Sequence, residues 1–80
     1  MNTVIIDKDK VAELKKYIIW VVGDKFFNIE DILGFVESNH EGKIAPETLC
    51  GLSLISIGEL LLEGKLTNVE NSFGVICKND

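Results

Sequence analysis

The residues of this 80-residue chain that could do chemistry are a single histidine, two cysteines and thirteen carboxylates. His40 lies beside Glu41 in a polar stretch. Nucleophilic catalysis would need a serine or cysteine beside the histidine and a third group that orients it. No spacing in the sequence places Ser38, Ser56 or a cysteine there, so we interpret His40 as a solvated loop residue.

The other reactive types also have simple structural interpretations. Glu30 and Asp31 are adjacent carboxylates, but they stand where a helix begins and acids stabilise that end of a helix. Cys50 and Cys77 form no C-x-x-C pair and have no neighbouring metal-ligand cluster, so we expect buried, reduced thiols. The glycines form neither a G-x-G-x-x-G nor a Walker pattern. We therefore expect no enzyme, no cofactor and no metal site.

Length and composition indicate one small domain, spanning residues 1–80. A hydrophobic content of 46% is enough for a core, although 80 residues is near the lower size limit for folding without metals or disulfides. No apolar run approaches the roughly 20 residues of a membrane span, and the start of the chain lacks the features of a signal peptide. We expect no membrane association and a cytoplasmic protein.

The first helix is predicted from about Lys8 to Val22. Its apolar residues gather on one side of a helical wheel, whereas Trp20 falls on the polar side and Ile19 lies well off the apolar stripe. Either a terminal segment covers Trp20, or Tyr17, Ile19 and Trp20 form an exposed interface for a protein partner or for homodimerisation. The end of this segment, residues 17–22, is also rich in strand-forming residues, so an extended conformation there is an alternative to the helix.

The second helix is predicted from Ile29 to about Ser38. Asn28 is a favourable N-cap, and Phe27 can pack across it onto Ile32. Phe35 lies at the edge of the apolar stripe and is interpreted as a core residue.

A third helix is predicted from Pro46, since proline suits the first helical position. Apolar residues cover more than one stripe of this helix, which indicates that it is buried on several sides or meets a partner. Gly51-Leu52-Ser53 also resembles the turn of a helix-turn-helix, which leaves open whether the segment is one helix or two. Gly64 can end it in the left-handed conformation.

A β-hairpin is predicted next, with strands at 65–69 and 73–78 joined by Glu70-Asn71-Ser72. A short strand near Ile5 or Phe26 would complete a small sheet. The expected fold is therefore α+β and mainly helical, a three-helix bundle with a C-terminal β-hairpin. The alternative is an all-helical domain with an irregular C-terminal segment.

A leucine-rich helix, the sequence Glu63-Gly64-Lys65-Leu66 and a short hairpin resemble the second half of a winged helix-turn-helix domain, over residues 28–78. The resemblance implies a DNA-binding transcription regulator. The side chains that it implies in a DNA groove are Thr48, Gly51, Ser53, Asn68, Asn71 and Ser72, and those at phosphates are Lys43, Lys65 and Lys78.

Charge favours a different partner. The chain has eight lysines, no arginine and thirteen acidic residues, for a net charge of −5, and residues 44–64 contain three glutamates and no base. DNA affinity comes largely from Lys and Arg at phosphates, and Arg is the commonest reader of guanine. We therefore expect a protein-interaction module or small regulator, acting through the surface near Trp20 or an acidic face on the second and third helices. The DNA-binding alternative requires the lysines to converge on one face.

Overall fold

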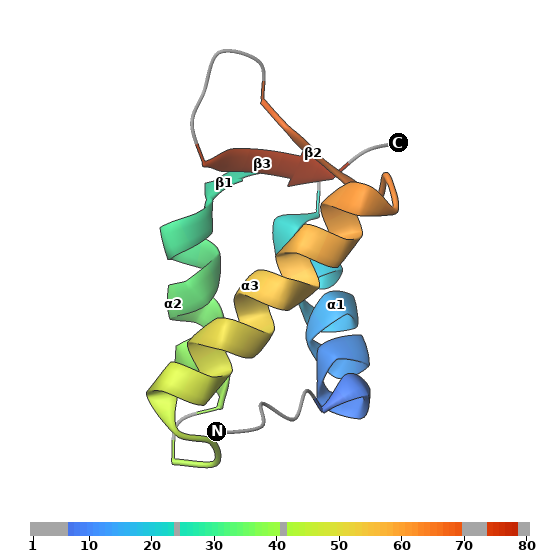
Figure 1. Ribbon diagram of the computed structural model, residues 1–80. Helices are drawn as coiled ribbons and strands as arrows, with labels where there is room; N and C mark the ends of the chain where they lie inside the picture. The colour runs from blue at the N-terminus through green and yellow to red at the C-terminus, as the bar shows by residue number, and fades with distance from the viewer. Residues whose placement is uncertain (1–6, 24, 41, 70–73, 79–80) are drawn as a thin grey trace.

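The computed structural model of this protein describes residues 7–23, 25–40, 42–69 and 74–78. Three helices stand below a small antiparallel sheet, and the third helix crosses in front of the other two (Figure 1). The elements in chain order are α1 (Lys8–Val22), β1 (Phe26–Asn28), α2 (Ile29–Asn39), α3 (Pro46–Leu62), β2 (Leu66–Asn68) and β3 (Val75–Lys78). The predicted α+β, mainly helical class is confirmed, and the all-helical alternative is wrong.

The helix boundaries agree closely with those predicted. Helix α1 begins after Asp7, whose carboxylate accepts a hydrogen bond from the Lys10 backbone N–H at 3.0 Å. Helix α2 begins after Asn28 as predicted, although the Asn28 side chain makes no capping hydrogen bond. Helix α3 is one continuous helix, so the two-helix alternative around Gly51 is wrong.

The sheet brings β1, in the first half of the chain, beside β3, in the last described segment. Its strand order is β1-β3-β2, with both neighbouring pairs antiparallel, and Phe27 lies opposite Ile76 in the register. The predicted strand near Phe26 is therefore confirmed, and the alternative at Ile5 lies outside the described residues. The Ile29 backbone N–H donates to the Gly74 carbonyl at 2.8 Å, which fixes the start of α2 beneath β3.

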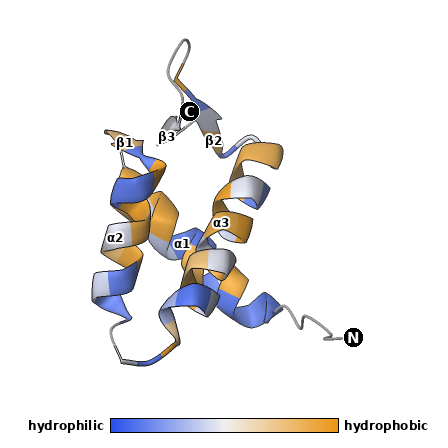
Figure 2. Ribbon diagram, turned by 60° about the vertical axis from the view of Figure 1, so that its left-hand side comes forward, coloured by the Kyte–Doolittle hydropathy of each residue, from blue (hydrophilic) through white to orange (hydrophobic). Residues whose placement is uncertain are grey.

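The core lies between the three helices and the underside of the sheet. Figure 2 shows hydrophobic residues along much of the length of α3. Leu60 is 1% exposed and belongs to the core. Phe35 is 44% exposed, so its assignment to the core is wrong. The buried apolar residues are Val11, Leu14, Ile18, Val22, Ile32, Val36, Leu49, Leu52, Ile57, Leu60, Leu66 and Ile76.

Two small polar residues of α3 are buried in the core, and one of them lies against α1. Ser53 and Ser56 are almost completely buried, and each hydroxyl donates to the carbonyl four residues earlier, on Leu49 and Leu52, at 2.7 Å. The Ser56 hydroxyl also lies 3.4 Å from the Val11 carbonyl of α1. Because their hydroxyls are satisfied within α3, these residues can be buried without the cost of an unpaired polar group.

Candidate functional site

An aromatic surface connects α1 to α2. Trp20 is 77% exposed, and its ring centroid lies 6.1 Å from that of Tyr17. The Tyr17 ring lies edge-on to His40 at 6.1 Å, and its hydroxyl donates to the Phe35 carbonyl at 3.3 Å. Tyr17 thus links α1 to the backbone of α2 beside the exposed Trp20. An exposed aromatic side chain of this kind is a common anchor at protein interfaces.

The structure separates the three residues of the predicted protein interface. Trp20 lies outside the core, as its place on the polar side of the wheel indicates, and no terminal segment in the described part of the chain covers it. Tyr17 and Ile19 are half-buried and pack against the core. Trp20 is therefore the group of the three that is available to a partner.

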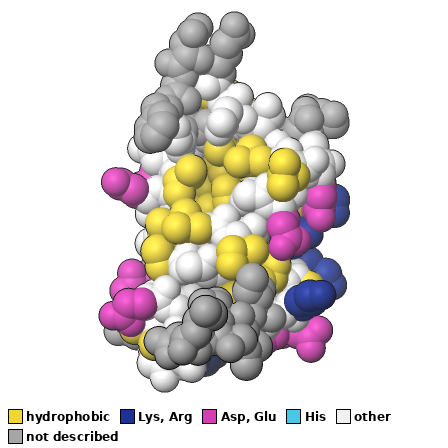
Figure 3. Space-filling model, in the orientation of Figure 1, with side chains coloured by type: hydrophobic (Ala, Val, Ile, Leu, Met, Phe, Trp, Pro, Cys, Tyr) yellow, Lys and Arg dark blue, Asp and Glu magenta, His cyan; other side chains and the backbone are white. Residues whose placement is uncertain are grey.

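A second apolar surface follows the outward side of α3. Figure 3 shows hydrophobic side chains gathered in the middle of the face that α3 crosses, with charged side chains at its margins. Leu54 is 46% exposed and Leu62 is 90% exposed. Cys50 is also exposed, so the expectation of a buried thiol is wrong for Cys50, whereas Cys77 is half-buried. Apolar patches rimmed by charge commonly mark interfaces.

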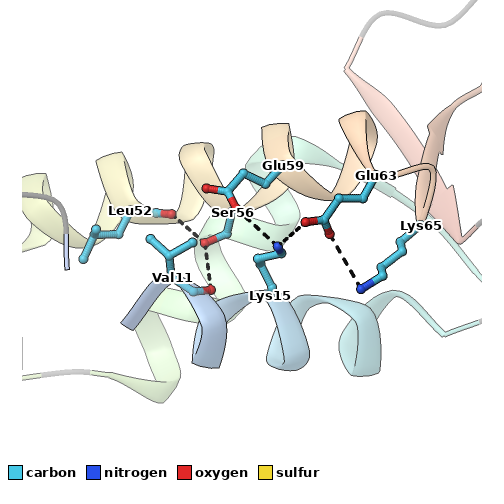
Figure 4. A network of polar contacts seen from close by, with 7 residues as sticks. All are labelled: Val11, Lys15, Leu52, Ser56, Glu59, Glu63 and Lys65. Atoms are coloured by element: carbon cyan, nitrogen blue, oxygen red, sulfur yellow. Dashed lines mark hydrogen bonds and ion pairs between the residues drawn. The ribbon is translucent and has the colours of Figure 1, made fainter. Parts of the chain in front are cut away.

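Lys15 and Lys65 pair with two glutamates at the C-terminal end of α3. Lys15 Nζ lies 2.6 Å from Glu63 Oε2 and 3.2 Å from Glu59 Oε1, and Lys65 Nζ lies 3.6 Å from Glu63 Oε1 (Figure 4). The hydrogen bond with Glu63 raises the pKa of Lys15, and the same bond lowers the pKa of Glu63. Both groups therefore remain charged over a wide pH range, and this cluster offers little net positive charge to a phosphate.

The candidate nucleic-acid contacts do not form one basic face. Lys43 precedes α3 and Lys65 follows it, so that a helix of 17 residues, about 25 Å long, separates them. Thr48 and Gly51 are exposed on α3, but Ser53 is 1% exposed and cannot present its hydroxyl to a DNA groove, so its assignment as a contact is wrong. Asn71 and Ser72 lie outside the described residues, as does the Lys78 side chain; Asn68 is exposed on β2.

His40 closes α2. It is the C-cap residue, and its ring Nδ1 lies 2.8 Å from the Val36 carbonyl; because a carbonyl can only accept, Nδ1 carries the proton and donates. A shallow hollow of about 420 Å³ beside His40 is lined by Glu37, Lys43, Ile44 and other residues of the α2–α3 connection. Among the described residues, no group of three or more His, Cys, Asp or Glu could hold a metal ion.

The sequence indicated that α3 carries apolar residues on several sides, but it did not show which of them remain outside the core. Once the burial of Leu49, Leu52 and Leu60 fixes the inner side, Leu54 must lie on the outer side. Together, the Trp20 surface and the outward side of α3 provide two places where a protein could bind.

None of the described helices is long and apolar enough to cross a membrane.

Comparison of the chain with models of known protein families, with curated proteins and with solved structures yields no match.

Proposed function

We propose that this chain is a small, acidic, non-enzymatic protein-interaction module with a winged-helix-like core. The observation that carries the proposal is the outward side of α3. In the winged-helix interpretation, α3 is the helix that would enter the DNA groove. Between Thr48 and Gly58 its exposed positions carry no charge, and Leu54 stands in their middle. An uncharged apolar helix side is suited to another protein surface, whereas phosphates would require Lys or Arg.

The surroundings of α3 support the same proposal. Lys15 and Lys65 lie within a cluster that also contains Glu59 and Glu63, and the exposed acids Glu30 and Asp31 lie in the first turn of α2. A nucleic acid approaching this side would meet carboxylates at its margin. The exposed, unpaired thiol of Cys50 fits a reducing compartment, which supports a cytoplasmic location.

Binding to mixed-sequence duplex DNA tests the proposal directly. At about 50 mM salt, where lysine contacts to phosphate are strongest, we expect no binding at protein concentrations up to about 100 µM. Fluorescence anisotropy of labelled DNA measures this, and a Lys43→Ala, Lys65→Ala variant serves as the matched control. Micromolar binding that weakens steeply as salt rises, and weakens further in this variant, would replace the proposal with DNA binding.

A further inference from the structure

The outward side of α3 combines leucines with glycines that leave open space beside them. Leu54 projects from it with 46% of its surface exposed. Leu61 lies two turns further along the same side; it is half-buried and packs partly against the core, so only part of it is open to a second copy. A Cβ added at Gly51 or at Gly58 would meet nothing within 4 Å. Both positions therefore leave open space, exposed at Gly51 and half-buried at Gly58, that a leucine of another copy could occupy.

These four residues lie on one side of α3. At about 100° per residue, they span an arc of about 80° on the helical wheel. The residues that enter the core lie on other sides of the helix, and so do Glu59 and Glu63, which bind Lys15. A second helix placed along this arc would contact leucine and glycine without displacing the ion pairs.

The order of the leucines and glycines is self-complementary in an antiparallel pair. In such a pair, with a two-fold axis at the level of Ser56, residues at equal distances before and after Ser56 share a layer. Leu54 then shares a layer with Gly58 of the second copy, and Leu61 shares one with Gly51. Each layer contains one large and one small residue, which lets two helices approach closely. A two-fold interface uses the same surface on both subunits, as this arrangement does.

The charges at the two ends of this side fit the same arrangement. Glu47 lies in the first turn of α3, and Lys65 lies three residues beyond its last residue, at an equal distance from Ser56. Both are exposed; Glu47 has no ion pair among the described residues, and Lys65 lies 3.6 Å from Glu63 of its own chain, so that a contact with Glu47 would be shared with Glu63. An antiparallel second copy would bring each Glu47 to the end of the helix that carries the other copy's Lys65. A parallel pair would instead place like charges together.

We infer that the partner of the α3 surface is a second copy of this chain, docked as an antiparallel, two-fold helix pair through Gly51, Leu54, Gly58 and Leu61. The inference rests on the proposed function, because it names the partner of a surface already assigned to protein binding. The dimer leaves Trp20, on α1, outside the pair of helices.

The first test fills one hollow without harming the protomer. Gly58→Leu adds a side chain to an open position in a helix, where leucine is more favourable than glycine, but it would collide with Leu54 of the second copy. Gly34→Leu is the matched control, since Gly34 is an exposed helical glycine on α2 with the same open surroundings. Sedimentation equilibrium of the full chain gives the mass, and thermal unfolding by circular dichroism verifies the fold.

We expect the wild type and Gly34→Leu to have twice the 8.9 kDa chain mass and Gly58→Leu to have the mass of one chain, with a dissociation constant raised at least tenfold. At a protein concentration low enough for the wild type to be monomeric, the unfolding temperature of Gly58→Leu should not be lowered. A wild type that remains monomeric at about 1 mM, a concentration at which even a weak specific contact is populated, would overturn the inference. So would a folded Gly58→Leu variant that dimerises as tightly as the wild type.

The second test examines the antiparallel direction. Glu47→Lys should raise the dissociation constant several-fold, because it places a lysine beside Lys65 of the second copy, and adding Lys65→Glu should restore most of the affinity. Failure of the double variant to recover would overturn the antiparallel arrangement.

Failure of this inference can be distinguished from failure of the proposed function. A dimer that Trp20→Ala dissociates and Gly58→Leu does not would overturn the α3 pairing while the protein-interaction proposal stands. Salt-sensitive DNA binding would overturn the proposed function, and the mass measurement would still decide whether α3 forms the pair.

Discussion

At the scale of single residues, the ion pair of Lys15 and Glu63 gives folding a defined dependence on pH. Glu63 has its pKa lowered from 4.5 by the hydrogen bond with Lys15, so its contribution to stability is present above pH 4.5 and is lost as pH falls through the lower value. Lys15 has its pKa raised from 10.5, so its contribution is present below pH 10.5 and is lost as pH rises through the higher value. Both contributions are present at neutral pH.

Glu63→Gln should therefore destabilise the protein at pH 7, and the difference from the wild type should shrink as pH falls below 4.5. Urea unfolding at several pH values measures the difference. Glu37→Gln is the control, because it removes a carboxylate of α2 that has no ion pair among the described residues, and it should change stability less at pH 7. A Glu63→Gln difference that is equally large at pH 7 and pH 3 would show that the charge of Glu63 is not its cause.

Trp20 is a large aromatic residue that lies mostly outside the core, so its role in stabilising the fold should be small. Because 77% of it is exposed, Trp20→Ala should lower the free energy of unfolding by less than about 1 kcal/mol. The same change should weaken binding of a partner that uses the α1 surface, as measured by cross-linking in extracts with wild type and variant compared side by side. A loss of several kcal/mol in urea unfolding would instead show that Trp20 stabilises the fold.

At the scale of elements, α3 has one side in the core and another outside. Leu60 is 1% exposed and Leu62 is 90% exposed, although they are two residues apart on the same helix. Leu60→Ala should destabilise the protein by about 2 to 5 kcal/mol, because it leaves a cavity between the helices. Leu62→Ala should change stability by less than about 0.5 kcal/mol.

Urea unfolding of both variants at the same low protein concentration measures this contrast, since association then contributes little to the apparent stability. Equal losses for Leu60→Ala and Leu62→Ala would mean that the two sides of α3 are not distinguished as the burial indicates.

The elements also show how far the sequence predicts the structure. Helix α1 and the start of α2 were predicted because their apolar residues recur at helical spacing. Asn28 marked the start of α2 by its residue type, although its side chain makes no capping hydrogen bond. The sequence did not show whether the segment of α3 forms one helix or two, because its apolar residues surround the helix axis and give no preferred side. Phe35 was misassigned because a residue at the edge of a stripe is buried or exposed according to how neighbouring helices are tilted, which local spacing does not contain.

The candidate site was less predictable than the fold. Trp20 could be placed on the polar side of α1 from spacing alone. The outward side of α3 could not be identified from spacing alone, because it is the part of the helix that α1, α2 and the sheet leave uncovered. Nor did the sequence reveal that Lys15 reaches Glu63, since that contact joins residues that are 48 positions apart in the chain. Long-range contacts of this kind decide which lysines remain available to a nucleic acid.

At the scale of the whole molecule, the net charge of −5 determines how association responds to salt. Two copies repel each other because both are negatively charged. Salt weakens this repulsion, since the Debye length falls from about 10 Å at 0.1 M to about 3 Å at 1 M. The two exposed contacts between Glu47 and Lys65 that an antiparallel dimer would form contribute little, because surface ion pairs are weak. The apolar contact of Leu54 with its glycine hollow is not weakened by simple salt.

The dissociation constant of the dimer should therefore fall several-fold between 50 and 500 mM NaCl, as measured by sedimentation equilibrium. The control is the Glu47→Lys, Lys65→Glu double variant, which has the same net charge and should respond to salt in the same way. A dimer that dissociates as salt rises would show that ion pairs, and not the apolar side of α3, hold it together. DNA binding would also weaken with salt, because it releases counterions, so association that strengthens with salt separates the protein partner from the nucleic acid.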